Sequence, residues 1–364
     1  MASQSLLFIP DISGFTQFVQ NTEVAHSQHV ISELLEVLVA ANIDNLELAE
    51  IEGDALFFFK SGEIPSQERL LAQFERMYSA FYSHLEKLEK NRICPCMACA
   101  TASQLELKII AHSGELQFLE VQDRRKPFGQ AVIEAHRLLK NSIESDHYAL
   151  ISNQLAQQIG LNTTYSSKLY HFEKGSDSYD GKEIGYLFSE INREHLSLTT
   201  DEPAFIFDPK CNPSFSFSKT INAPAEQVLE LITNYGKRYL WVEGVDKFEF
   251  NPNEVTRLET EHVCVIDGKH YNFTTIGLNQ TDFKYVYGEL TEDIPFTDKV
   301  FQFFLLNPIN ATTSELKIEG YIQAKNPLHK LILSLFARKA LGKNNEKALV
   351  ALQKLFNKSM AILQ

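Results

Sequence analysis

The chain has 364 residues, of which 44% are hydrophobic and 22% charged, and its formal net charge is −13. This length suggests two domains of ordinary size, and this composition is typical of a globular protein with real hydrophobic cores. The negative charge argues against a general binder of nucleic acid or anionic membranes, because no overall positive field would attract phosphates.

The N-terminal residues MASQSLLFIP lack the basic region of a signal peptide. No stretch reaches the ~18 apolar residues that a membrane span needs. The five cysteines are an odd number and do not suggest a disulfide framework. We therefore expect a cytoplasmic protein without a transmembrane segment.

The spacing of apolar residues predicts alternating strands and helices in the first half. We expect a strand at 6–10, a helix at 22–41, a strand hairpin at 46–59, a helix at 67–89, a strand pair at 105–121 around His112, and a helix at 131–139. This order indicates an α/β sandwich with helices packed on a sheet.

A change of character near residue 195 predicts a linker. The segment 196–213 is rich in turn formers and lacks periodicity, so we expect one domain at 1–195 and another at 214–364. In the second domain, Pro224 opens a helix that ends near 232. Six strands should follow, near 246–250, 256–265, 270–277, 282–290, 299–306 and 313–323, before a long helix from 327 to about 363.

Two carboxylates stand out in the first domain. Asp11 follows the first strand, and Asp54 lies in the turn of the predicted hairpin. Taken alone, Asp11 is explained as a helix cap and Asp54 as a turn residue of the hairpin. Turn positions on adjacent strands can meet at one edge of a sheet, and two carboxylates there repel each other unless a cation lies between them. The pair therefore predicts a site for Mg²⁺ or Mn²⁺.

Four sequence blocks carry a resemblance to a known family. DISGFT at 11–16, EGDA at 52–55, KIIAHSGEL at 108–116 and GQAVIEAHR at 129–137 occur in this order within about residues 6–190. In this combination the region resembles the catalytic domain of class III adenylate and guanylate cyclases. The resemblance implies a ferredoxin-like α/β domain that forms a head-to-tail homodimer and binds a nucleoside triphosphate.

The resemblance also implies roles for individual residues. Those implied to hold two divalent ions on the triphosphate are Asp11, Ile12 and Asp54. Those implied to cradle phosphates with backbone N–H groups are Ser13, Gly14, Phe15 and Thr16. Arg137, acting in the site of the partner subunit, is implied to stabilise the transition state.

The base-recognising positions depart from the family. The first is Lys in adenylate cyclases and Glu in guanylate cyclases, and it matches Glu50 here. The second is Asp in adenylate cyclases and often Cys in guanylate cyclases, but Lys126 here. A carboxylate accepts and an ammonium donates hydrogen bonds, which suits guanine first and uracil second, and not adenine. The alternative is that both are solvated charges on a retired site. Ile133 replaces the Asn that helps to orient the ribose, and an Ile side chain cannot form that hydrogen bond.

Cys94, Cys96 and Cys99 form a C-x-C-x₂-C cluster that the cyclase blocks do not predict. Three thiolates at this spacing could bind one structural Zn²⁺, with His112 or a partner subunit as a source of the fourth ligand. The alternative is that they are small buried residues.

The segment 214–245, SFSFSKTINAPAEQVLELITNYGKRYLWVEGV, is similar to the opening of the START-like (polyketide cyclase/dehydrase, helix-grip) superfamily. This resemblance covers about 213–360. It implies an α+β domain in which an antiparallel sheet curls around a long helix, with a cavity for a small apolar ligand. We find no convincing acid–base constellation in this half.

Two functions follow from these patterns. The first is a homodimeric nucleotidyl cyclase that is regulated by an apolar ligand in the second domain. The second is a catalytically degenerate cyclase-like dimer that serves as a nucleotide- or lipid-binding regulatory module.

Overall fold

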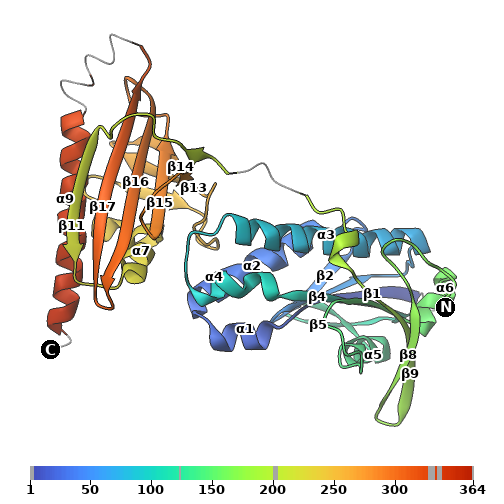
Figure 1. Cartoon of the computed structure of the whole chain (residues 1–364). Coiled ribbons are helices and arrows are strands. Elements are labelled where there is room, and N and C mark those ends of the chain that lie inside the picture. The colour runs from blue at the N-terminus through green and yellow to red at the C-terminus, as the bar shows by residue number, and fades with distance from the viewer. Residues whose placement is uncertain (1–3, 123, 200–203, 327–332, 334–337, 363–364) are drawn as a thin grey trace. The chain divides into compact units, whose positions relative to one another are not determined.

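The computed structural model describes residues 4–122, 124–199, 204–326, 333 and 338–362 (Figure 1). The chain divides into two compact units, Met1–Glu89 with Thr101–Asp201 and Lys90–Ala100 with Glu202–Gln364. Each unit has its own sheet. The domain boundaries and linker expected from the sequence stay predictions.

The first unit is built on a seven-stranded sheet with the order β2-β3-β1-β4-β7-β9-β8. Its strands are β1 (Gln4–Ser13), β2 (Glu47–Glu52), β3 (Ala55–Lys60), β4 (Glu106–Glu115), β7 (Tyr148–Ser152), β8 (Glu173–Tyr179) and β9 (Lys182–Glu190). The order β2-β3-β1-β4 is that of a ferredoxin-like βαββαβ unit. A separate hairpin consists of β5 (Gln117–Val121) and β6 (Arg124–Phe128).

Helices cover both faces of this sheet (Figure 1). The helical segments of this half of the chain are α1 (Phe15–Asn21), α2 (Val24–Ala40), α3 (Gln67–Lys90), α4 (Met97–Thr101), η1 (Ala102–Gln104), α5 (Gln130–Leu138), α6 (Asn153–Ile159) and η2 (Arg193–His195). On α3, Phe74, Met77 and Phe81 recur at helical spacing and are fully buried. On the α5 side, Ala131 and Ala135 pack into a cluster with the strand residues of β1 and β4. The expected helices at 67–89 and 131–139 are confirmed.

Two strands, β4 and β5, lie within the expected range 105–121, but the expected turn between them at His112 is wrong. β4 runs without interruption from Glu106 to Glu115, paired with β1 along its whole length, and His112 and Ser113 are buried within it. The Ser-Gly pair resembles a turn in sequence, but Gly114 serves a different purpose. A Cβ at Gly114 would lie 2.5 Å from the Cβ of Ala131, so the glycine permits the close approach of α5.

The second unit is a curled antiparallel sheet with a long helix. Its sheet has the order β11-β17-β16-β15-β14-β13-β12, and β10 (Ile206–Phe207) pairs in parallel with β14. The strands are β11 (Phe215–Ile221), β12 (Lys247–Phe250), β13 (Glu261–Ile266), β14 (Lys269–Leu278), β15 (Tyr285–Thr291), β16 (Thr297–Asn310) and β17 (Thr313–Ala324). Its helices are α7 (Ala225–Thr233), η3 (Tyr235–Leu240) and α9 (Arg338–Ile362).

The helix α9 packs against β11 and β17 (Figure 1). Its Leu349 and Leu352 are fully buried in one core with Val228 of α7 and Phe304 of β16. This arrangement confirms the expected α+β fold in which a sheet grips a helix. Pro224 is the residue just before α7 rather than within its first turn. The expected helix residues before 338 lie outside the described residues, apart from Leu333.

Candidate functional site

The two carboxylates expected to bind metal lie at one edge of the first unit. Asp11 is within β1, which continues to Ser13, and is paired with Ala55 of β3 on one side and Lys108 of β4 on the other. The backbone N–H of Ile12 donates to the carbonyl oxygen of Asp54 at 3.1 Å. The β2–β3 turn, in which Gly53 has a φ of 70°, therefore brings Asp54 beside Asp11.

The electrostatics of this edge reflect two nearby negative charges. Burial, and then the charge of Asp11, raises the pKa of Asp54 above its ordinary value. The Nζ atom of Lys108 lies 3.0 Å from Oδ2 of Asp11, and both side chains are largely buried. Burial alone would lower the pKa of Lys108, but the Asp11 charge raises it. One of the two carboxylates therefore already has a cationic partner.

Lys108 was missed by the sequence analysis, although the signal was present. It begins the third of the four blocks, and antiparallel pairing of that block with the first strand would have set it opposite Asp11.

The donor chemistry of this edge fits a hard divalent cation. Carboxylate oxygens are the ligands that Mg²⁺ and Mn²⁺ prefer, and a cation would relieve the repulsion that raises the pKa of Asp54. The hydroxyl of Ser13 adds a polar atom, since it is buried and has no hydrogen-bond partner among the described residues. Gly14 follows with a φ of 85° and leads directly into α1, where Phe15 and Thr16 form the first turn.

The two expected base-reading residues lie together. Nζ of Lys126 in β6 donates to Oε1 of Glu50 in β2 at 2.7 Å, and both side chains are nearly half exposed. Strands from separate parts of the sequence thus bring one donor and one acceptor to the same surface.

Arg137 has a partner that the sequence did not reveal. It lies in the last turn of α5 and forms an ion pair with Asp180 in the β8–β9 turn. Those two strands were not predicted, so their turn could not be considered. Ile133, four residues earlier, is 48% exposed, which leaves an apolar side chain at the surface of the same helix.

A buried pair of groups lies between α5 and β4. Nε2 of His112 is 3.5 Å from Oε2 of Glu134. Burial lowers the pKa of His112 to about 4. Burial alone would raise the pKa of Glu134, but bonds from Lys182 and Gln130 hold it below the ordinary value. Nδ1 of His112 also lies 2.9 Å from the Ser152 hydroxyl. Among the described residues, His112 is not part of the group of ligand atoms around the three cysteines, so the idea that it is a zinc ligand finds no support.

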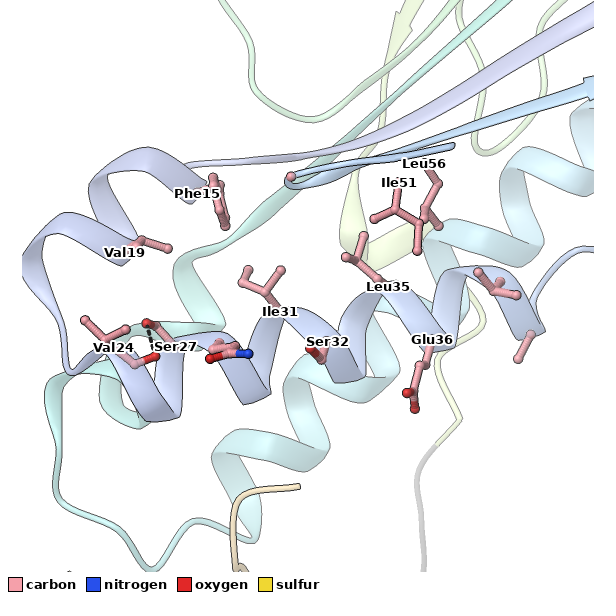
Figure 2. A pocket seen from close by; sticks show the side chains of 14 residues that line it. Phe15, Val19, Val24, Ser27, Ile31, Ser32, Leu35, Glu36, Ile51 and Leu56 are labelled. Atoms are coloured by element: carbon pink, nitrogen blue, oxygen red, sulfur yellow. Dashed lines mark hydrogen bonds between the residues drawn. The ribbon is translucent and has the colours of Figure 1, made fainter. Parts of the chain in front are cut away.

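An apolar groove of about 720 Å³ adjoins the carboxylate edge (Figure 2). It lies between α1, α2 and the β2–β3 hairpin, and Ile31 and Leu35 of α2 face Ile51 and Leu56 of the hairpin across it. Phe15 and Val19 of α1, with Val24 of α2, line the end of the groove away from the hairpin. Ile51 is 57% exposed, so this surface is open to solvent in the single chain.

The three clustered cysteines are close in space as well as in sequence. The Sγ atoms of Cys94, Cys96 and Cys99 all lie within 4.8 Å of one another. They form a group that could hold a metal ion, of a different ligand type from the carboxylate edge.

The interior of the second unit holds a fully buried network of charged groups. Nη2 of Arg238 lies 2.5 Å from Oε1 of Glu289 and donates to the Tyr287 hydroxyl at 2.6 Å. That hydroxyl donates to Glu289 at 2.6 Å, and Nη1 of Arg238 is 3.2 Å from Nε2 of His262. Burial, followed by the Arg238 charge, lowers the pKa of His262 to about 3. Sequence spacing gave no sign of this cluster.

Comparisons with known proteins cover parts of the chain. A family model described as a protein of unknown function (DUF2652) matches residues 31–148. The uncharacterized protein Rv2561/Rv2562 of Mycobacterium tuberculosis (strain ATCC 25618 / H37Rv) is 31% identical over 127 residues, which are 35% of this chain and 59% of that protein. The chain thus spans less than two thirds of the length of that relative.

Solved structures are similar to each half. The guanylate cyclase domain of RhGC from Catenaria anguillulae is 16% identical with a TM-score of 0.37, covering 52% of this chain and 98% of that chain. The adenylyl cyclase CyaB from P. aeruginosa is 16% identical with a TM-score of 0.38, covering 53% and 97%. A START superfamily protein from Mycobacterium smegmatis is 14% identical with a TM-score of 0.30, covering 40% and 97%.

The first half is thus similar to nucleotide cyclase domains and the second half to START-superfamily proteins, as the sequence resemblances predicted. At these identities the similarity concerns the fold alone. Among the described residues, no helix combines the length and apolar character that crossing a membrane requires.

Proposed function

We propose that the first unit is a metal-dependent nucleotidyl cyclase that acts on GTP or UTP in preference to ATP. One observation carries the proposal: Asp54 lies beside Asp11, and this proximity contributes to a raised pKa of Asp54. The fold does not need two carboxylates close together at the end of these strands. A site that binds a triphosphate with its metal ion does need such a pair.

The residues that would hold Mg²⁺ or Mn²⁺ are Asp11 and Asp54, with Ile12 contributing from the backbone. Such an ion, when bound, lowers the pKa of the ribose 3′-hydroxyl and neutralises charge on the triphosphate. In the reaction the 3′-oxygen bonds to the α-phosphorus, the bond from that phosphorus to pyrophosphate breaks, and the hydroxyl proton passes to water. Backbone N–H groups of Ser13–Thr16 bind the phosphates.

The Glu50–Lys126 pair supports an imide-type base. With the two side chains 2.7 Å apart, one base edge can reach both. Glu50 would accept from N1–H of guanine or N3–H of uracil, and Lys126 would donate to O6 or O4. Adenine offers an acceptor and a donor at the corresponding atoms, so it mismatches both side chains.

A homodimer completes the proposed site. Arg137 of the partner subunit would balance the charge that develops at the α-phosphate. To do so, its guanidinium would leave the ion pair with Asp180 and contact the substrate instead. The apolar groove supports association, because open apolar surfaces of this kind mark contact sites on proteins.

The test is to incubate the purified chain with Mn²⁺ and ATP, GTP, CTP or UTP separately, and to detect cyclic products by mass spectrometry. We expect cyclic GMP or cyclic UMP, its loss in Asp54→Ala, and its retention in Glu47→Ala. Glu47 is a matched control because it is an exposed carboxylate of the same hairpin. Product that persists in Asp54→Ala would refute the metal site, and cyclic AMP as the main product would refute the base assignment.

A second candidate, a catalytically inactive nucleotide-binding module, is favoured by the Lys108–Asp11 ion pair and by Ile133. Lys108 neutralises a carboxylate that would otherwise bind metal, and Ile133 cannot orient a ribose. Binding of GTP with Mn²⁺, measured by calorimetry, without any cyclic product would favour this candidate over the enzyme.

For the second unit we propose that a small apolar ligand binds within the START-like fold and alters the geometry of the dimer. Phe215, Trp241 and Phe304 are buried in the core that also holds Leu349 and Leu352 of α9, which supports an apolar interior. A fluorescent fatty-acid probe should bind the full chain, and its displacement by added apolar ligands should change the rate of cyclisation.

A further inference from the structure

The cluster of cysteines at 94–99 has no role in the proposed cyclase. Cys94, Cys96 and Cys99 are each half-buried, and all three belong to the segment Lys90–Ala100 of the second unit. They supply three of the five cysteines of the chain within six consecutive residues. The other two, Cys211 and Cys264, lie far away in sequence.

The backbone of this segment presents the sulfur atoms together. Cys96 comes directly before α4, and Cys99 lies in the first turn of that helix. The backbone N–H of Cys99 donates to Sγ of Cys96 at 3.4 Å, and the N–H of Ala100 donates to the Cys96 carbonyl at 3.0 Å. This contact fixes the Cys96 sulfur against the first turn of α4, next to the residue that carries the Cys99 sulfur.

The distances match a shared ion better than a disulfide. A tetrahedral zinc ion with Zn–S bonds of about 2.3 Å brings its sulfurs to roughly 3.8 Å from one another. The three sulfurs already lie within 4.8 Å of one another, so small side-chain rotations suffice. A disulfide would join two of them and leave the third close by, which explains only part of the cluster.

We propose that Cys94, Cys96 and Cys99 bind one structural Zn²⁺ as thiolates, with a fourth ligand from outside this segment or from water. The soft sulfur ligands select zinc over the hard ions that suit Asp11 and Asp54. This site is therefore independent of the proposed cyclase and does not rest on it. Its effect would be to cross-link the turn before α4 and stabilise the fold.

The experiment measures metal in the full chain. Protein purified under reducing conditions should contain one zinc per chain by elemental analysis, and native mass spectrometry should show the same stoichiometry. Replacement of the zinc by Co²⁺ should give the thiolate-to-cobalt charge-transfer absorption. The proposal holds whether the fourth ligand is a nitrogen or an oxygen atom. Chelation should lower the melting temperature.

Variants separate this site from adventitious metal. Cys96→Ser and Cys99→Ser should each lose stoichiometric zinc and the cobalt absorption, whereas Cys211→Ser, an exposed cysteine elsewhere, should retain both. If the variants fail to fold, competition of the wild type with a zinc chelator still reports affinity. No zinc and no cobalt absorption in reduced protein, a disulfide-linked mass, or zinc retained in Cys96→Ser would overturn the proposal.

Discussion

Charged groups occur in two contrasting settings within this chain. In the second unit, Arg238 and Glu289 are fully buried and satisfied by each other and by Tyr287. At the edge of the first unit, Asp11 has one cationic partner, Lys108, while Asp54 is left beside it with a raised pKa. The buried charges of the second unit are paired within the core, whereas the incompletely neutralised pair of the first unit is where we propose that a cation binds. Three experiments test this contrast.

The largest effect is expected from Arg238→Met. This change leaves Glu289 charged and buried without its partner, which should destabilise the second unit by about 3–5 kcal/mol. The double change Arg238→Met with Glu289→Leu should recover much of this loss, because an apolar pair of similar volume needs no solvation. Denaturant unfolding followed by Trp241 fluorescence would measure both. A single variant within about 1 kcal/mol of wild type would mean that the network is not structural.

Acid should destabilise both units through histidines that are buried and neutral. The pKa of His112 is lowered to about 4 and that of His262 to about 3, against 6.5 for an unfolded chain. Below pH 6.5 the two histidines bind a proton in the unfolded state but stay neutral in the folded state. Their contribution to the free energy of unfolding is therefore fully present above pH 6.5 and falls as the pH drops toward 4. Between pH 7 and 5 each histidine should cost about 2 kcal/mol.

Denaturant curves at several pH values would test this, with His112→Gln and His262→Gln as variants that lack the titrating group. Each variant should have a shallower pH dependence than wild type. An unchanged slope in both would show that carboxylates dominate acid unfolding.

The smallest change in stability, and of opposite sign, is expected for Asp54→Asn. Removing the charge relieves repulsion from Asp11, so the first unit should gain roughly 0.5–1 kcal/mol. The same variant should lose Mn²⁺ binding, measured by calorimetry. Glu47→Asn on the same hairpin should change neither property. A destabilised Asp54→Asn would mean that the carboxylate has a structural role and would weaken the contrast between the two units.

Sequence periodicity predicted the elements that have one clearly apolar face. The helix α3 and the strands β14 to β17 follow strong patterns and are confirmed. The missed elements have weak patterns. α6 has seven residues, and β8, with the sequence EKGSDSY, is polar on both faces and half exposed. The partner of Arg137 lies in the turn after β8, so it could not be anticipated.

The carboxylate pair was predictable because each Asp belongs to its own recognisable block. The electrostatic environment of the pair was not predictable, because the residue opposite Asp11 depends on the register of β1 and β4. A shift of one residue would have set Leu107 or Ile109 opposite Asp11 instead of Lys108. Likewise, the contact between Glu50 and Lys126 requires a folded hairpin to meet a strand 76 residues away, which no local pattern encodes.

The apolar groove between α2 and the β2–β3 hairpin has a thermodynamic consequence. Association through a surface such as Ile31, Leu35 and Ile51 buries hydrocarbon, and hydrocarbon burial carries a negative heat-capacity change. The attraction therefore weakens on cooling. If a second copy docks there, specific activity should fall with dilution, and fall further in the cold, so that the cellular abundance of the chain would itself set how much of it is active.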